Sequence, residues 1–424
     1  MSMPNDVDIV LGFLTAMRLG LTWVGISRAY TGRERQTLLA DCGARMYEPQ
    51  PLDEPVEFPD IDPVAPAVIA YTSGTTGVPK GATHSQRNLV VPGLMARERD
   101  DGHGTHGIYL PFTSVNLMCL GPINSLVNAT TCVAIGSSQA LDVANAIRDH
   151  AIMRLSASAA TVIDFVNDDR ITPSHFTSLE RLGVGGSATP EWLFAAYETK
   201  FGRPFGTGYG LTEGPTTVTR TEIGAPRNPG SAGGPLEHLV IEIRDANTNL
   251  LATGDVGEVC LRPATHGLYA DIYTPMLGYW QRPDATAQAL RNGRLHTGDI
   301  GWLDAQGELH IEDRRVDLIV RGGTNIYPAE IERLLNDDPR ILASAVIAKA
   351  DERLGHVPVA FIQAADGADI DASAVLALCT ENLAKFKVPV EVRFVDEFPR
   401  NSMGKILRTE LRSRLEGQPQ HNEE

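Results

Sequence analysis

The chain has 424 residues, which is too long for one hydrophobic core and predicts two or three domains. Its composition, with 42% apolar and 21% charged residues, is that of a folded globular protein. A formal net charge of −16 argues against nucleic acid or an anionic membrane as the main partner. Any polyanionic ligand must therefore be held by a local group of donors and cations.

The cysteines and the first residues indicate a cytoplasmic protein. The five cysteines are odd in number and have no CxxC spacing, so we expect reduced core residues: Cys42, Cys119, Cys132, Cys260 and Cys379. The start is acidic and lacks the cationic region of a signal peptide. The apolar run Ile9–Met17 is broken by Arg18 and is too short to cross a bilayer, so no membrane span is expected.

The first elements are predicted as a helix over residues 7–21 and a strand over Trp23–Ile26. The helix is indicated by apolar residues at every fourth position: Ile9, Phe13, Met17 and Leu21. The Pro- and acid-rich stretch 49–66 is typical of a surface connection. A short apolar strand over Val68–Tyr71 then leads into a Gly/Ser/Thr loop.

Residues 108–200 alternate between strands and helices. Apolar runs lie near 131–135 and 180–184, and helical patterns lie near 141–150 and 190–200. This alternation predicts parallel sheet covered on both faces.

From about Pro226 the pattern changes to short alternating segments between turns. Val240–Ile243, Glu258–Leu261 and Glu308–Ile311 predict antiparallel sheet, with a small barrel as one arrangement. After residue 315 a compact unit begins, whose first helix starts at Pro328 and is expected to bury three residues: Ile331, Leu334 and Leu335.

The predicted fold class is therefore α/β in two parts. Residues 1–315 form a large domain of parallel αβ layers, of which 226–315 is mostly antiparallel and barrel-like. Residues 316–424 form a small α+β domain, with the boundary near Val316.

The loop that follows Tyr71 carries the strongest chemical signal. Its glycines allow backbone N–H groups to approach phosphate oxygens, its hydroxyls add donors, and Lys80 adds a point charge. The expected phosphate-binding residues are Thr72, Ser73, Gly74, Thr75, Thr76, Gly77 and Lys80. The P-loop of NTPases does not fit, because Pro79 precedes the lysine and Gly81 follows it.

This loop resembles the phosphate loop of the adenylate-forming superfamily, which includes acyl-CoA synthetases, luciferases and peptide-synthetase adenylation domains. Five more segments resemble that family's motifs, in the family's order over residues 71–410: Gly185-Gly186-Ser187-Ala188, Tyr209-Gly210-Leu211-Thr212-Glu213, Thr297-Gly298-Asp299, Asp313-Arg314 with Gly322–Glu332, and Pro399–Ile406. Six motifs in order make a chance match improbable.

The resemblance implies a role for each motif. Gly186, Ser187, Ala188, Tyr209 and Gly210 would surround adenine, and Asp299 and Arg314 would bind ribose. Thr212 would donate to the α-phosphate, and Glu213 would bind Mg²⁺ as a hard oxygen ligand.

The resemblance also implies that the C-terminal domain is mobile. Lys405 would stabilise charge on the carboxylate and the α-phosphate as the acid is adenylated. The Gly322-Gly323 face would form the thiol channel when the domain rotates.

The sequence departs from the family pattern at three places. An N-terminal segment that normally precedes Asp8 is absent, so the chain is expected to be shortened at its start. Ser114 stands where many acyl-CoA synthetases carry a histidine, and the nearby His103 and His106 form an HxxH pair without further ligands in view. Val316 stands at the hinge, where a polar residue is frequent.

The function these motifs indicate is ATP-dependent activation of a monocarboxylic acid to an acyl-AMP, followed by transfer to coenzyme A. Two alternatives stay open: transfer to a carrier-protein phosphopantetheine, and a catalytically dead nucleotide-binding subunit. The expected ligands are ATP, Mg²⁺, coenzyme A and a small carboxylic acid. The sequence does not identify the acid. It also leaves the oligomeric state open, with a homodimer as one alternative.

Overall fold

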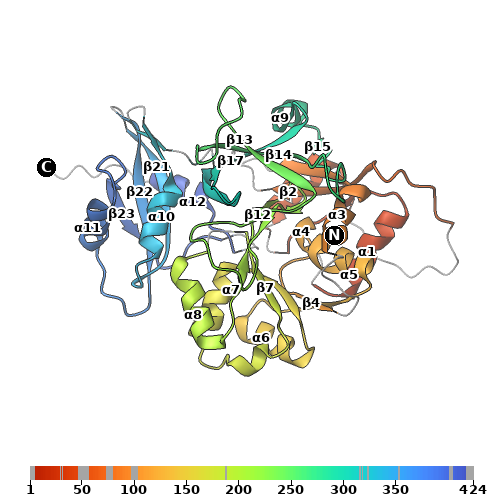
Figure 1. The fold of residues 1–424 in the computed structure, drawn as a ribbon, viewed down its shortest axis with the longest axis horizontal. Helices are drawn as coiled ribbons and strands as arrows, with labels where there is room; N and C mark the ends of the chain where they lie inside the picture. Colours follow the sequence, from red (N-terminus) through yellow and green to blue (C-terminus); the bar gives the residue numbers. More distant parts are fainter. Residues whose placement is uncertain are drawn as a thin grey trace.

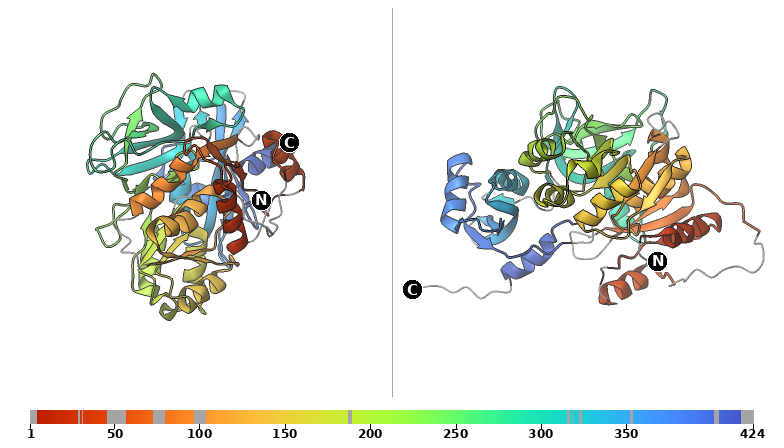
Figure 2. Two further views of the ribbon diagram at one scale, coloured as in Figure 1. Left: turned by 90° about the vertical axis from the view of Figure 1, so that its right-hand side faces the viewer. Right: turned by 90° about the horizontal axis from the view of Figure 1, so that it is seen from below.

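The computed structural model of the protein describes residues 5–28, 30, 32–45, 57–72, 80–96, 104–186, 189–314, 317, 319–321, 324–351, 354–400 and 404–416. Within these ranges, three larger sheets build the N-terminal part, and a fourth builds a C-terminal part that lies to one side of them (Figures 1 and 2). No helix among these residues is both long enough and apolar enough to cross a membrane.

The first sheet has the order β1-β2-β3-β15 and carries the predicted phosphate loop. β1 pairs with β2 in parallel, whereas β3 is antiparallel to both β2 and β15. Its strands are β1 Trp23–Val24, β2 Pro66–Thr72, β3 Lys80–Ser85 and β15 Gly278–Tyr279. The helices of this region are α1 Val7–Arg18, α2 Gly32–Cys42, α3 Gln86–Ala96, α4 Val115–Met118, the π-helix Cys119–Ile123 and α5 Asn124–Asn128.

The first helix is shorter than its sequence period predicts. Ile9, Phe13 and Met17 are buried as expected, but Leu21 is 56% exposed. The helix ends at Arg18, and Gly20 has φ +66°, a left-handed conformation that turns the chain away from the helix axis. The strand that follows is limited to Trp23–Val24 instead of extending to Ile26.

The second sheet is parallel throughout, as predicted, with the order β5-β4-β6-β7-β8. Its strands are β4 Thr105–Ile108, β5 Thr131–Ala134, β6 Arg154–Ala157, β7 Arg181–Val184 and β8 Gly206–Thr207. Its helices are α6 Ala140–Asp149, α7 Ala159–Asn167, the 3₁₀ turn Pro173–Phe176 and α8 Glu191–Phe201. One apolar cluster joins these strands and helices into a core.

The third sheet is the curled antiparallel sheet expected after Pro226. It runs β13-β14-β17-β16, with β18 paired to β17, and comprises β13 Leu239–Arg244, β14 Gly257–Pro263, β16 Leu290–Arg291, β17 Arg294–Leu303 and β18 Leu309–Arg314. Helix α9 Pro283–Ala289 precedes β16. Two short ribbons, β9 Gly210–Leu211 with β10 Thr216–Thr217 and β11 Thr219–Arg220 with β12 Gly234–Pro235, complete this region.

The C-terminal sheet runs β20-β19-β22-β21, with β23 parallel to β22. Its elements are β19 Ile319–Arg321, β20 Thr324–Ile326, α10 Pro328–Asn336, β21 Ile341–Asp351, β22 Gly355–Ala364, α11 Ala372–Asn382, β23 Glu391–Phe394 and α12 Arg408–Glu416. α10 and α11 pack in one apolar cluster and α12 in another, so the sheet is covered on two faces.

Two predictions for this part have different outcomes. Helix α10 begins at Pro328 as predicted and buries Ile331 and Leu335, but Leu334 is only partly buried. The domain boundary expected near Val316 stays a prediction, because Val316 lies outside the described residues.

All five cysteines are free. Cys119, Cys260 and Cys379 are buried, whereas Cys42 and Cys132 are half-buried, so the prediction that all five are core residues was too broad.

Candidate active site

The phosphate loop connects two antiparallel strands. Thr72 ends β2 and is the cross-strand partner of Lys80, which begins β3. A P-loop instead joins a strand to a helix, so the topology agrees with the rejection of that motif. The loop residues Ser73, Gly74, Thr75, Thr76 and Gly77 lie outside the described residues, as does the side chain of Thr72.

The segment Tyr209–Glu213 forms the first arm and the turn of a small ribbon. Leu211 pairs with Thr216, so Thr212 and Glu213 lie in the turn between β9 and β10. Two carbonyl groups of this turn are held from elsewhere: His84 Nε2 lies 2.8 Å from the oxygen of Thr212, and the backbone N–H of Met276 donates to the oxygen of Glu213 at 2.8 Å. The turn is therefore fixed by contacts at both of its proposed catalytic residues.

His84 makes its contact as a neutral ring. It is fully buried in β3, and burial lowers its pKa to about 4, so the imidazole is uncharged at neutral pH. Because the partner is a carbonyl oxygen, Nε2 carries the proton and donates it to Thr212. Its other nitrogen, Nδ1, has no hydrogen-bond partner among the described residues.

One tyrosine connects the proposed metal ligand to the phosphate-loop lysine. Tyr279 lies on β15 opposite Ala82 of β3, and its hydroxyl donates to Glu213 Oε1 at 2.8 Å. Lys80 Nζ lies 5.4 Å from the centroid of the same ring, within the range of a cation–π contact. Glu213 and Lys80, which are distant in the sequence, thus share Tyr279 as a neighbour.

The proposed ribose carboxylate lies in a bulge of β17. Glu258 pairs with Ile300 and Cys260 with His296, so Val259 alone faces residues 297–299. Gly298 adopts φ +75° in this bulge, and Asp299 N donates to Thr297 Oγ1 at 3.1 Å.

Asp299 is 4% exposed and accepts a hydrogen bond of 2.5 Å from Tyr209 Oη. On the neighbouring strand its cross-strand partner is Arg314, whose side chain lies outside the described set. The backbone register thus brings together the two residues that the sequence assigns to ribose. A carboxylate accepts more than one donor, so Asp299 can keep the bond from Tyr209 and still accept from a ribose hydroxyl.

The proposed adenine turn lies at the carboxyl end of the parallel sheet. Gly185 follows β7, and its N–H donates to the oxygen of Ala157 at 3.2 Å. A Cβ added at Gly185 would lie only 3.3 Å from the oxygen of Gly208, which is a tight contact. Gly186 has φ +86°, which favours glycine there. Gly210 lies in β9, and Ser187 and Ala188 are outside the described residues. In open α/β sheets, ligands bind in a crevice outside the carboxyl ends of the strands, which is this edge.

Gly404, in the C-terminal lysine motif, lies near the same edge. A Cβ on Gly404, which precedes Lys405, would come within 3.9 Å of Ser158 Oγ, and Ser158 is the N-cap of α7 directly after β6. Arg400 closes the loop by donating to the oxygen of Gly404 at 2.8 Å and by a bridge to Ile406.

Arg400 and Asp164 of α7 carry opposite charges that attract each other. Burial raises the pKa of Asp164 in α7, and the charge of Arg400 acts in the opposite direction. Gly322 and Gly323, assigned to the thiol channel, lie outside the described residues, between the paired residues Arg321 and Thr324.

The HxxH interpretation receives no support from the ring of His106. That ring lies 3.2 Å from Arg154 Nη1 through Nε2 and 3.5 Å from Asn124 Nδ2 through Nδ1. Among the described residues, His106 belongs to no group of three side chains that could hold a metal ion. His103 lies outside the described residues, and Ser114 caps α4 without a side-chain hydrogen bond.

Two residues of the site were missed by the sequence analysis. His84 follows Lys80 by four positions, but nothing local distinguishes it from a core histidine. Tyr279 reaches Glu213 only because β15 pairs with β3, which is a long-range event.

Comparison with known proteins gives two family matches. Residues 46–280 match the model of the AMP-binding enzyme family, and residues 330–405 match the AMP-binding enzyme C-terminal domain. The first match alone covers more than half of the chain.

Individual relatives agree with these matches. The indoleacetate–CoA ligase of Aromatoleum aromaticum is 32% identical over 96% of this chain and 86% of its own length. The fatty acid–[acyl-carrier-protein] ligase of Streptomyces coeruleorubidus is 32% identical over 84% of this chain and 69% of its own length. The o-succinylbenzoate CoA synthetase of Bacillus subtilis, solved with its acyl-adenylate intermediate, superposes with a TM-score of 0.84 at 27% identity over 96% of this chain and 86% of its own. The chain belongs to the AMP-binding enzymes, the adenylate-forming superfamily.

Proposed function

We propose that this chain is an AMP-forming acid–CoA ligase that activates a monocarboxylic acid with ATP and transfers the acyl group to coenzyme A. The single observation that carries the proposal is the anchoring of Tyr209–Glu213. This segment is bound through Tyr209 to Asp299, through Thr212 to His84 and through Glu213 to Tyr279. It thereby connects the residues proposed to bind adenine, ribose, the phosphates and Mg²⁺.

The first half-reaction needs a nucleotide held across these groups. A carboxylate oxygen of the acid attacks the α-phosphorus of ATP, the mixed anhydride forms, and pyrophosphate leaves. Asp299 is suited to accept from ribose hydroxyls, Thr212 to donate to the α-phosphate, and Lys80 to neutralise the phosphates. Each lies on an element that the sheets fix, which is the positioning that phosphoryl transfer requires.

Glu213 fits a magnesium-binding role. Mg²⁺ prefers oxygen ligands and is usually held by one or two carboxylates together with substrate phosphates and water. Glu213 is a single carboxylate that shares Tyr279 as a neighbour with Lys80 and is oriented by Tyr279 Oη. When bound, the ion would supply charge neutralisation on the phosphates. The chain's own part is to orient that carboxylate.

The position of Gly404 supports a role for its neighbour Lys405 in the first half-reaction. Gly404 lies next to Ser158, at the edge of the sheet that also carries the adenine turn. We propose that residues 316–424 form a mobile domain and that this arrangement brings Lys405 to the reacting carboxylate and α-phosphate. Rotation of the domain would then withdraw Lys405 and bring Gly322 and Gly323 to the thiol path. In the second half-reaction the thiol attacks the acyl carbon and AMP leaves.

The relatives point to two thiol acceptors. Coenzyme A is favoured by the indoleacetate and o-succinylbenzoate ligases, whereas the carrier-protein ligase of Streptomyces coeruleorubidus favours a phosphopantetheine on a protein. Both acceptors present the same thiol arm, so the discrimination depends on the surface outside the thiol channel. The acid is proposed to be a monocarboxylate, aliphatic or aromatic, and the free cysteines fit a cytoplasmic enzyme.

Two coupled assays test the proposal. A panel of aliphatic and aromatic acids is incubated with the protein, ATP and Mg²⁺, and pyrophosphate release is measured. Coenzyme A is then added and AMP release is followed. Acid-dependent pyrophosphate release followed by CoA-dependent AMP release is expected. Pyrophosphate release without a response to coenzyme A would favour a carrier protein, and no release with any acid would favour a catalytically dead nucleotide-binding subunit.

A further inference from the structure

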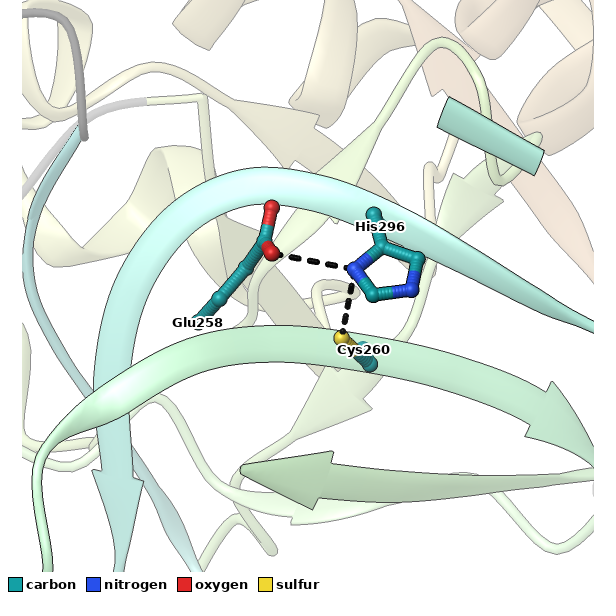
Figure 3. Close-up of side chains that lie close together, drawn as sticks. All are labelled: Glu258, Cys260 and His296. Carbon is teal, nitrogen blue, oxygen red and sulfur yellow. Dashed lines mark hydrogen bonds and ion pairs between the residues drawn. The ribbon is translucent and has the colours of Figure 1, made fainter. Parts of the chain in front are cut away.

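Three side chains with metal-binding atoms meet in the curled antiparallel sheet, next to the bulge that presents Asp299. Glu258 and Cys260 lie on β14, and His296 lies on β17 (Figure 3). His296 Nδ1 is 3.3 Å from Cys260 Sγ and 3.0 Å from Glu258 Oε2. The side chains of His296 and Glu258 are only 2% and 10% exposed, and Cys260 is fully buried. None of them has a role in the reaction proposed above.

The backbone register preorganises this cluster. Cys260 and His296 are direct cross-strand partners, and Glu258 lies two residues before Cys260, on the same face of β14. As Figure 3 shows, Nδ1 of the imidazole faces both the thiol and the carboxylate. Nε2 has no hydrogen-bond partner among the described residues, so the polar contacts of the ring are on the cluster side.

The donor set is that of a zinc-class ion. Cysteine sulfur, histidine nitrogen and carboxylate oxygen are the ligands of protein zinc, at about 2.3, 2.0–2.1 and 2.0–2.2 Å. In a tetrahedral site these lengths separate nitrogen from sulfur by about 3.6 Å and nitrogen from oxygen by about 3.4 Å. The observed 3.3 and 3.0 Å therefore need to open by a few tenths of an ångström, within the reach of side-chain torsions.

Arg291 is the competitor for such an ion. Its Nη2 lies 3.3 Å from Glu258 Oε2 and 3.1 Å from His296 Nδ1, and its side chain is 36% exposed. In this arrangement the guanidinium balances the carboxylate, while the thiol is neutral. A divalent ion would instead be balanced by the carboxylate and a thiolate. Arg291 could then leave for solvent, which would open an entry path and a position for a water ligand.

We propose that Glu258, Cys260 and His296 form a second metal site that takes a zinc-class divalent ion in exchange for the Arg291 guanidinium. The site is separate from the magnesium position at Glu213. His296 directly precedes the bulge that presents Asp299, and Thr297 Oγ1 donates to the oxygen of Val259 at 2.8 Å. A bound ion would fix His296 and thereby restrict the bulge that follows it, so we expect the ion to weaken ATP binding.

Binding is tested with the full chain, without ATP, by titration with Co²⁺ as a spectroscopic probe and by competition with Zn²⁺. We expect one equivalent to bind and to give a thiolate-to-cobalt charge-transfer band. Cys260→Ser should remove the band and weaken binding by at least about tenfold. Cys119→Ser, at a buried cysteine outside the cluster, is the matched control and should bind like the unchanged protein. Absence of the band, or its survival in Cys260→Ser, would overturn the proposal.

Arg291→Gln provides a test that leaves all three ligands intact. Removing the competing cation should tighten Co²⁺ binding several-fold. Equal or weaker binding would overturn the proposal that the ion replaces the Arg291 guanidinium. For the coupling, Zn²⁺ should raise the KM for ATP in the unchanged protein but not in Cys260→Ser, and a chelator should reverse the rise. An equal rise in both proteins would place the inhibitory ion elsewhere.

Discussion

Tyr209 Oη lies 2.5 Å from Asp299 Oδ2, so this hydroxyl joins the segment Tyr209–Glu213 to the bulge of β17. Tyr209→Phe retains the ring but removes this hydroxyl. We expect the KM for ATP to rise roughly three- to tenfold, because the oriented bond to a charged group is worth about 1.5–3 kcal/mol and water replaces part of it. Steady-state kinetics at saturating acid measures the effect. An unchanged KM would mean that the tyrosine does not orient Asp299.

Asp299→Ala should weaken ATP binding without abolishing the chemistry. Asp299 is proposed to bond ribose, which is distant from the reacting phosphate, and each charged bond lost costs about 1.5–3 kcal/mol. ATP affinity should therefore fall at least about tenfold, whereas kcat at saturating ATP stays close to that of the unchanged protein. Asp284→Ala, at an exposed aspartate in α9, is the control. An unaltered ATP titration in Asp299→Ala would remove this residue from the site.

The double variant measures the coupling between Tyr209 and Asp299 in ATP binding. If Tyr209 acts on ATP only through Asp299, the double variant should be no worse than Asp299→Ala alone. Additive losses would show that the hydroxyl of Tyr209 has a separate role.

Tyr279→Phe should raise the Mg²⁺ requirement. Its hydroxyl orients Glu213 Oε1 at 2.8 Å, and loss of such an orienting group commonly reduces metal affinity about tenfold or more. The measurement is pyrophosphate release against Mg²⁺ concentration at fixed ATP. Tyr197→Phe is the matched control, because the buried Tyr197 hydroxyl has no hydrogen-bond partner among the described residues. The same Mg²⁺ dependence in both variants would contradict the role given to Glu213.

His84 makes the fold sensitive to acid. Burial lowers its pKa to about 4, whereas an unfolded histidine titrates near 6.5, so the unfolded chain binds more protons between these values. Stability is therefore complete above pH 6.5 and is lost as the pH falls towards 4, by roughly 3 kcal/mol for this group. His238, whose pKa burial also lowers to about 4, adds to the loss.

His84→Gln isolates the contribution of His84. Glutamine keeps an N–H donor for the oxygen of Thr212 but does not titrate. Urea unfolding at pH 7 and pH 5 should show a smaller acid-induced loss in the variant than in the unchanged protein. His238→Gln should reduce the loss in a similar way and leave the KM for ATP unaffected, whereas His84→Ala should alter it. An acid dependence that His84→Gln does not change would show that this residue is not buried as a neutral ring.

Local chemistry made much of this fold predictable. The parallel sheet followed from alternating patterns, and helix α10 begins at Pro328 because proline suits the first helical turn. Leu21 was placed wrongly because a periodic pattern does not show where Gly20 ends the helix.

Some residues of the candidate site could also be predicted from the sequence, and others could not. Residues that belong to contiguous motifs, such as Thr212 and Glu213, could be named from the sequence. His84 and Tyr279 could not, because their contacts depend on strand pairing and on a turn that approaches from more than a hundred residues away. A buried histidine or tyrosine has many structural uses, and only the tertiary contact identifies which one applies.

We propose that Lys405 acts in adenylation and not in thioester formation, and Lys405→Ala separates the two steps. Pyrophosphate release from ATP and acid measures the first step, and thioester formed from synthetic acyl-AMP and coenzyme A measures the second. Lys385→Ala, at an exposed lysine of the same domain, is the control.

We expect Lys405→Ala to slow the first step by roughly 10²–10³-fold, or about 2.7–4 kcal/mol, because a charge-stabilising donor is lost. The second step should keep nearly its full rate, because acyl-AMP already contains the activated bond. Equal losses in both steps, or no loss in either, would show that Lys405 does not act specifically in adenylation.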